Sequence, residues 1–132
     1  MTLLVDTHAL LWWLADVGEL SQAQVQALER AESREEPIGI AAISLWESAK
    51  LVERGRLRLD QTVDVVLVEI EKHRGLDVLP LTARIALEST RLGPSVPSDP
   101  VDQLIVATAR VHALQVVTAD ERIRRAGAVS VL

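Results

Sequence analysis

The chain has 132 residues, of which 48% are apolar, and its charges are mixed along its length, so we expect one folded domain over residues 1–132. It contains no cysteine, which excludes disulfides and zinc–thiolate sites, and no apolar run approaches the ~20 residues of a membrane span. Acidic residues outnumber basic residues 19 to 14, and the resulting net charge of −5 argues against broad nucleic-acid binding.

Short apolar runs alternate with helical spacing along the chain. Residues 3–5 form an apolar run that ends at Asp6 and is typical of a buried strand, and the spacing of Leu10, Leu11 and Leu14 indicates a helix directly after it. In chain order we expect a strand at 3–5, helices at 7–14 and 21–32, a strand at 38–41, helices at 44–54 and 62–74, a strand at 77–81, helices at 82–92 and 100–112, a strand at 115–118, a helix at 120–126 and a fifth strand at 129–132.

Capping and turn residues delimit these elements. Ser21 with Gln24, and Ser44 with Glu47, have the spacing of capping boxes at helix starts, and Gly55 ends the second of these helices. Because strands that alternate with helices require right-handed crossovers, we expect an α/β fold with a short, mainly parallel sheet covered by helices on both faces.

Four carboxylates lie where a predicted strand, or the loop after it, leads into a helix: Asp6, Glu47, Asp102 and Asp120. The carboxyl ends of parallel strands meet at one edge of a sheet, where ligand sites form. Four acidic side chains at that edge would repel each other unless a cation held them, and hard oxygen ligands favour Mg²⁺ or Mn²⁺. The pattern predicts metal-assisted chemistry on a phosphate ester.

Each carboxylate also has a purely structural explanation. Asp6 and Asp120 would serve as helix caps, Glu47 would complete its capping box, and Asp102 would favour the helix dipole. These explanations do not account for all four positions following strands or strand-end loops. They also leave Asp102 unexplained, because Asp99 already supplies a cap to the same helix.

Four segments of the chain, in order, resemble PIN-domain ribonucleases, specifically the VapC-type toxin of a VapBC toxin–antitoxin pair. The segments are 4–12 (LVDTHALLW), 44–47 (SLWE), 99–109 (DPVDQLIVATA) and 117–120 (VTAD). The resemblance implies a three-layer α/β/α PIN-like domain and a Mg²⁺-dependent endoribonuclease, with Mn²⁺ as the other candidate ion. It also implies an RNA substrate, a cognate VapB-type antitoxin and a homodimer. The absence of cysteine fits a cytoplasmic protein, and the absence of a long apolar run predicts no membrane contact.

The same resemblance maps the acidic residues of the family onto Asp6, Glu47, Asp102 and Asp120 as catalytic and metal-binding residues. We expect Asp6 and Asp102 to bind the metal directly, and Glu47 and Asp120 to complete the site directly or through water. A metal-activated water would then attack the scissile phosphate in line.

Three further residues have open roles beside this site. We interpret Asp99 as a helix cap first and an outer ligand of the metal site second. The hydroxyls of Thr7 and Thr118 would either orient carboxylates or substrate, or serve as ordinary turn hydroxyls.

The densest basic stretch, Lys50, Arg54, Arg56 and Arg58, follows Glu47. Lys50 and Arg54 share the helical face of Glu47, so the stretch is either an RNA-binding strip leading away from the metal or a solvated face with a Glu47–Lys50 pair. Because the rest of the chain is acidic, we favour an RNA-binding strip of Lys50, Arg54 and Arg56.

Two other functions compete with the ribonuclease. A receiver-like phospho-acceptor domain also uses acids at strand ends and Mg²⁺, but it requires a lysine near the last strand. The only lysines, Lys50 and Lys72, lie mid-chain. A non-catalytic PIN-like interaction module would keep the acids for folding or partner binding, which is disfavoured by the presence of all four.

Overall fold

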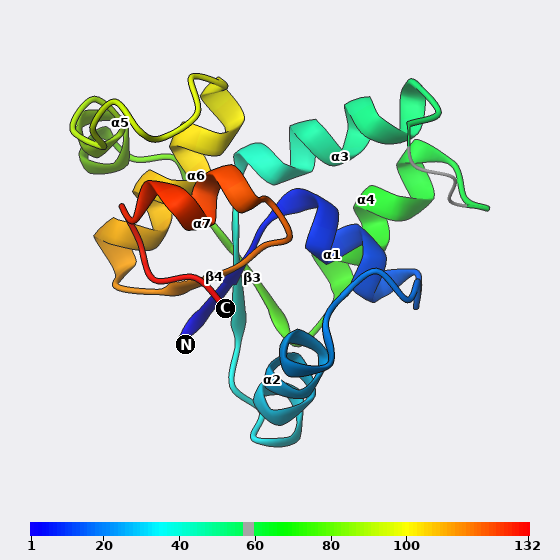
Figure 1. The fold of residues 1–132 in the computed structure, drawn as a ribbon. Helices are drawn as coiled ribbons and strands as arrows, with labels where there is room; N and C mark the ends of the chain where they lie inside the picture. The colour runs from blue at the N-terminus through cyan, green and yellow to red at the C-terminus, as the bar shows by residue number, and fades with distance from the viewer. Residues whose placement is uncertain (57–59) are drawn as a thin grey trace.

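The computed structural model describes residues 1–56 and 60–132, and in them a parallel sheet lies between layers of helices (Figure 1). The strands are β1 (Leu3–Val5), β2 (Ile38–Ala41), β3 (Leu76–Leu79) and β4 (Gln115–Val117). Their order across the sheet is β3–β2–β1–β4, and every pairing is parallel. The predicted α/β class with a short parallel sheet is confirmed.

Strand β1 brings the two ends of the sequence together. Leu4 pairs with Gly39 of β2 on one side and with Val116 of β4 on the other. Beyond the strand, the backbone N–H of Asp6 donates to the carbonyl of Val117 at 3.1 Å. The carboxyl ends of β1 and β4 therefore lie side by side, at the edge where ligand sites form in parallel sheets.

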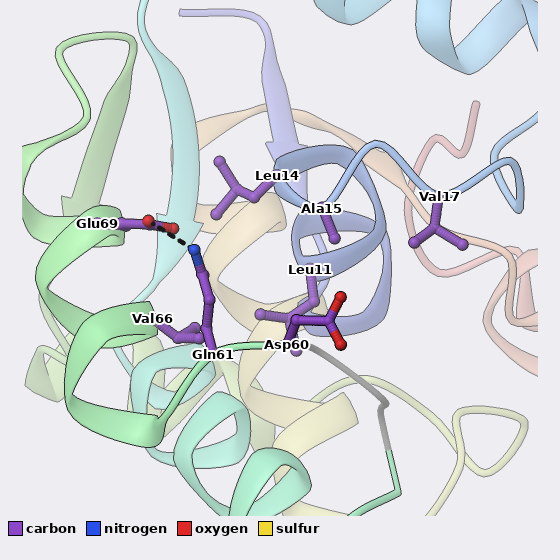
Figure 2. Close-up of a pocket in the computed structure, with 8 residues that line it drawn as sticks. All are labelled: Leu11, Leu14, Ala15, Val17, Asp60, Gln61, Val66 and Glu69. Atoms are coloured by element: carbon purple, nitrogen blue, oxygen red, sulfur yellow. Dashed lines mark hydrogen bonds between the residues drawn. The ribbon is translucent and has the colours of Figure 1, made fainter.

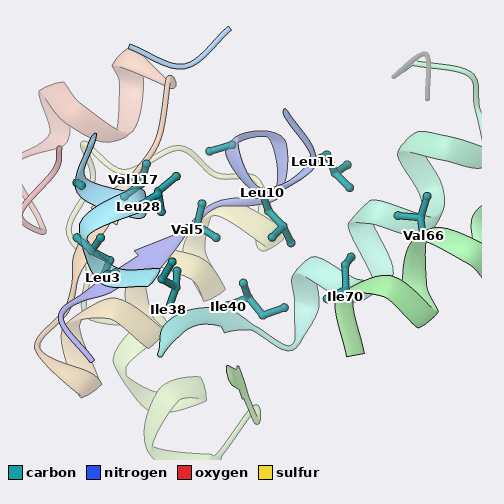
Figure 3. Packing of buried hydrophobic residues seen from close by; sticks show 13 residues of the cluster. Leu3, Val5, Leu10, Leu11, Leu28, Ile38, Ile40, Val66, Ile70 and Val117 are labelled. Atoms are coloured by element: carbon teal, nitrogen blue, oxygen red, sulfur yellow. The ribbon is translucent and has the colours of Figure 1, made fainter. Parts of the chain in front are cut away.

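Helices cover both faces of the sheet. They are α1 (Thr7–Leu14), α2 (Gln22–Ser33), α3 (Ile43–Glu53), α4 (Val63–Lys72), α5 (Ala83–Ser89), α6 (Pro100–His112) and α7 (Glu121–Ala126). Leu3 and Val5 belong to a cluster that also includes side chains of α1, α2 and α4 (Figure 3), whereas Leu4 faces the opposite way and packs with α6, as the alternation of a strand requires. A third cluster joins α5, α6 and α7. Within the described ranges, no helix is long and apolar enough to cross a membrane.

Side-chain caps fix the helices whose starts were predicted. Asp6 caps α1, Ser21 and Gln24 form both hydrogen bonds of a capping box on α2, and Asp99 caps α6. Each cap satisfies backbone N–H groups that the first helical turn leaves without partners. Gly55 follows α3 with a φ of +62°, a conformation that glycine adopts at little cost.

The predicted capping box of Ser44 and Glu47 is wrong. Helix α3 begins at Ile43, and its N-cap Ala42 makes no side-chain hydrogen bond. Ser44 lies inside the helix, where its buried Oγ accepts a 3.0 Å hydrogen bond from the hydroxyl of Thr7. The contact between α1 and α3 therefore uses the hydroxyl that local spacing assigned to a cap.

Several predicted elements extend further than they do in the structure. Pro80 lacks the N–H that strand pairing uses, and β3 ends before it at Leu79. Helix α5 ends at Ser89, whose hydroxyl donates to a carbonyl of the last turn, instead of continuing to residue 92. The predicted fifth strand at 129–132 is reduced to one parallel bridge between Val131 and Val116.

Candidate active site

Asp6 lies at the carboxyl end of β1 and is almost fully buried, with 8% of its surface exposed. One carboxylate oxygen accepts the N–H of Ala9 at 2.9 Å, and the other accepts the hydroxyl of Thr118. Burial raises the pKa of Asp6 above its usual value, although both hydrogen bonds oppose that rise. The fold thus holds a carboxylate in an environment that penalises its charge.

Thr118 is held in place in turn by Gln24, which lies far away in the sequence. Its hydroxyl accepts the N–H of Asp120 at 3.0 Å, and its carbonyl accepts Nε2 of Gln24 at 2.9 Å. The same Nε2 donates to the carbonyl of Leu132 at 2.8 Å. Sequence reasoning identified Gln24 only as a capping residue, because no local signal points to partners 94 and 108 positions away.

Thr7 follows Asp6 directly, but its hydroxyl donates to Ser44 of α3. Glu47 lies one turn further along α3 and is half-buried. Its negative charge raises the pKa of both Asp6 and Asp102. Glu47 is therefore the electrostatic link between the acid after β1 and the acid on α6.

Asp99 and Asp102 begin helix α6 with different roles. Asp99 accepts the N–H groups of Val101 at 2.8 Å and of Asp102 at 3.3 Å, so it caps the helix. The Asp102 side chain is 18% exposed, and its pKa is raised to about 6 by burial and by the negative charges of Asp99, Asp120 and Glu47. Because the cap is already supplied, the Asp102 carboxylate is available to a ligand.

Asp120 caps α7 and also binds an arginine that sequence reasoning missed. Its Oδ1 accepts the N–H of Arg122 at 2.9 Å, and its two oxygens accept Nε and Nη2 of the same guanidinium at 3.2 and 2.8 Å. These bonds lower the pKa of Asp120. Nη2 of Arg122 also lies 3.6 Å from Oδ2 of Asp102. The sequence did contain a signal for this ion pair, because the arginine follows the capping aspartate by two residues.

The four predicted carboxylates thus come from the ends of β1 and β4 and from α3 and α6, and their charges act on one another. As placed, no three His, Asp or Glu side chains in the described ranges are close enough together to hold a metal ion. The donor set nevertheless fits a hard divalent cation, because it offers only oxygen. Burial raises the pKa of Asp6 and of Asp102, and neighbouring carboxylates add to the rise, so a cation would relieve a penalty on the charged form of each.

The basic stretch runs from α3 into the segment after it. Lys50 lies 3.6 Å from a carboxylate oxygen of Glu53 and 6.0 Å from the ring centre of Trp46. Arg54 and Arg56 are exposed beyond the end of the helix. Arg58 lies outside the described residues.

A cavity of about 320 Å³ lies beside the end of α1 and the start of α4 (Figure 2). It is lined by Leu11, Leu14, Ala15, Val17, Asp60, Gln61, Val66 and Glu69. Gln61 and Glu69 join across it through a 3.0 Å hydrogen bond. Its lining includes none of the four carboxylates, so the cavity and the acidic edge of the sheet are separate features.

Comparison with known proteins places the chain among proteins of matching length. The PIN domain family model matches residues 3–129. The chain is 37% identical over 123 residues to Ribonuclease VapC22 of Mycobacterium tuberculosis (strain ATCC 25618 / H37Rv), covering 93% of this chain and 90% of that protein. Two solved complexes have the same fold. DNA-bound VapBC from Salmonella typhimurium matches with a TM-score of 0.72 at 21% identity, covering 100% of this chain and 97% of the other. VapBC2 from Rickettsia felis, bound to a promoter DNA fragment, matches with a TM-score of 0.74 at 16% identity and coverage of 100% and 98%.

Proposed function

The chain belongs to the PIN-domain family, and we propose on that basis that it is a metal-dependent endoribonuclease, the toxin of a type II toxin–antitoxin pair. The observation that carries this function is the partly buried position of Asp102 among other carboxylates: burial raises its pKa to about 6, and the charges of Asp99, Asp120 and Glu47 add to the rise. Such a field suits a divalent ion and a phosphodiester better than it suits a purely structural role.

We assign the metal to Asp6, Glu47, Asp102 and Asp120. PIN-domain ribonucleases generally depend on a divalent ion, and the all-oxygen donor set favours Mg²⁺, with Mn²⁺ as the alternative. When bound, the ion supplies an acidified water as nucleophile and offsets charge on the phosphate.

The residues of the chain prepare this site. Thr118 and the N–H of Ala9 fix the orientation of the Asp6 carboxylate and favour its ionised form. Asp99 holds the first turn of α6, which directs Asp102 to the same edge. Thr7 supports the site from further out, through its bond to Ser44 between α1 and α3.

We propose that RNA follows the strip of Lys50, Arg54 and Arg56, whose charges would contact phosphates. The regulatory partner would be a VapB-type antitoxin, and an arginine from it would find a ready dock among the carboxylates. As parts of the same proposal, the protein forms a homodimer and lies in the cytoplasm, where cellular RNA is found.

The test is cleavage of total cellular RNA by purified, EDTA-stripped protein with and without added Mg²⁺ or Mn²⁺. Asp6→Asn and Asp102→Asn keep side-chain shape but remove charge, and each should lose metal-dependent cleavage. Glu29→Gln, a matched change on the exposed face of α2, should cleave like wild type. Sequencing the new RNA ends after brief expression, with Asp6→Asn as the control, would identify the substrate.

Wild-type protein that cleaves no RNA with either ion, and expression that generates no new RNA ends, would favour a non-catalytic interaction module. If Asp102→Asn alone retained full activity, Asp99 would replace Asp102 in the assignment. The family match removes the receiver-like alternative.

A further inference from the structure

The guanidinium of Arg122 lies against two of the four carboxylates. It contacts both oxygens of Asp120, and its Nη2 also approaches Oδ2 of Asp102. The Arg122 side chain is 67% exposed, whereas those of Asp102 and Asp120 are 18% and 24% exposed. The arginine is therefore the more solvent-exposed partner in both contacts.

Local structure fixes where this guanidinium can reach. Asp120 is held from both sides, because its N–H donates to Thr118 and its carboxylate caps α7. Arg122 follows two residues later, so its side chain folds back over the cap. The contact with Asp102 goes beyond that local turn, because it joins α7 to the first turn of α6.

The oxygens involved belong to two of the four carboxylates to which we assign the metal. Oδ2 of Asp102 and Oδ2 of Asp120 both face Nη2 of Arg122. A guanidinium remains charged at any cellular pH, and its fork of N–H donors matches carboxylate oxygens. A carboxylate oxygen that is engaged with this fork is less available to a cation, and two cations this close would repel each other.

We propose that Arg122 is the built-in counter-ion of the metal-free site and must leave Asp102 and Asp120 before a divalent ion can bind them. The inference rests on the proposed function, since it presumes that these carboxylates take a metal. Arg122 is then a positioning residue. It keeps the acids of α6 and α7 together without metal, and it weakens the affinity of the folded protein for the ion by competing with it.

The chain offers a matched control on the same helix. Arg124 pairs through Nε with Glu121 at 3.5 Å and is 43% exposed. Arg122→Gln and Arg124→Gln remove the same charge from α7, but only the first removes a cation from Asp102 and Asp120. Arg122→Lys keeps the charge and loses the fork, so it should fall between wild type and Arg122→Gln.

The experiment measures Mn²⁺ binding to EDTA-stripped proteins by calorimetry, with the melting temperature recorded in EDTA and in Mn²⁺. We expect Arg122→Gln to bind Mn²⁺ about tenfold more tightly, within the range usual for coupled sites. It should also melt at a lower temperature in EDTA and gain more from Mn²⁺ than wild type does. Arg124→Gln should match wild type in affinity.

A second readout follows the guanidinium itself. In ¹⁵N spectra of the arginine side chains, the Nε–H signal that disappears in Arg122→Gln should move toward the position of a solvated arginine as Mg²⁺ is added to wild type. The signal of Arg124 should stay in place. A static Arg122 signal at saturating Mg²⁺ would overturn the inference.

The binding data separate this inference from the proposed function. Wild type that binds Mn²⁺, with equal or weaker binding by Arg122→Gln, would overturn the competition and leave the metal site intact. Wild type that binds no divalent ion would overturn both the metal site and the role of Arg122.

Discussion

Asp6 and Asp102 lie at the same edge of the sheet, but the protein holds them by different means. Asp6 belongs to an anchored half of the site, formed with Thr118 and Gln24, in which buried hydrogen bonds fix each group. Asp102 belongs to a charge-held half, formed with Asp120 and Arg122, in which a solvent-exposed guanidinium balances two carboxylates.

The difference shows which parts of the site depend on folding and which depend on ions. Breaking a buried hydrogen bond leaves a polar group without water, so changes in the anchored half should cost stability and activity together. Changes in the charge-held half should alter responses to pH, salt and metal while leaving the fold nearly intact.

The largest effect should come from Gln24→Met, which keeps the length of the side chain, removes both hydrogen bonds donated by Nε2 and also removes the Oε1 acceptor of the capping box. The carbonyl of Thr118 loses a buried partner and that of Leu132 a partly buried one, so unfolding free energy should fall by about 2–3 kcal/mol. Urea unfolding measures the loss, with Gln26→Met on the exposed face of α2 as the control. Equal stability of the two variants would show that the anchored half is not anchored by Gln24.

Thr118→Val and Thr7→Val form a matched pair, and each should reduce stability by less than Gln24→Met does. Both remove a buried hydroxyl and should cost about 1–2 kcal/mol of stability. Only Thr118 bonds to Asp6, and that bond lowers the pKa of Asp6, so only Thr118→Val should raise it.

In Thr118→Val, more of Asp6 would therefore be protonated at a given pH. The pH profile of RNA cleavage should shift toward higher pH in this variant and stay unshifted in Thr7→Val. Identical profiles for the two variants would contradict a role for Thr118 beyond packing.

The charge-held half should show itself in the pH dependence of stability. The pKa of Asp102 rises from 3.8 to about 6 on folding, so the folded protein binds this proton more tightly than the unfolded chain does. The stabilisation of the folded protein by the tighter-bound proton of Asp102 is complete below pH about 4 and is lost as pH rises through about 6.

Metal-free protein should accordingly gain about 1 kcal/mol at pH 7 from Asp102→Asn, less than the full pKa difference implies, because the side chain is partly solvated. Thermal melts in EDTA at pH 4 and pH 7 measure this, and saturating Mg²⁺ should cancel the advantage of Asn. A wild-type stability that rises between these two pH values relative to Asp102→Asn would contradict the assignment.

The basic strip lies outside both halves and should change RNA binding alone. Replacing Lys50, Arg54 and Arg56 by Ala should weaken RNA affinity about tenfold and reduce the log–log salt slope by about 2, because each phosphate contact releases counterions. Cleavage at saturating RNA should change less.

The control for the strip is the double change Lys72→Ala with Arg74→Ala, at exposed positions near the end of α4. An unchanged salt slope in the triple variant would leave the strip as a solvated surface, consistent with the pairing of Lys50 to Glu53.

Sequence patterns predicted the elements wherever the deciding interaction was local. Helices α1 and α6 begin where expected, because Asp6 and Asp99 cap their first turns within three residues. The predicted cap of α3 was wrong because the Ser44 hydroxyl bonds to Thr7, 37 positions away, and local spacing does not indicate that contact.

The same distinction applies to the site. The assignment of the four carboxylates to a metal site stays a prediction, made because each follows a predicted strand or the loop after it. Gln24 was missed because its bond to Thr118 joins distant parts of the chain. The bond of Arg122 to Asp120 is local and had a sequence signal, but its approach to Asp102 on α6 had none. The resemblance to the family predicted the acidic residues, but it did not predict Gln24 and Arg122, which contact their neighbourhood.

The bond between Thr118 and Asp6 spans 112 positions, and β1 pairs with β4 near the far end of the chain. Contacts of such separation form late, since the long loop between them must close first. While a ribosome is still making the chain, Asp6 and Glu47 have emerged but Thr118 and Asp120 have not. The candidate site can therefore assemble only when synthesis of the chain is nearly finished, because it needs residues from both ends of the sequence.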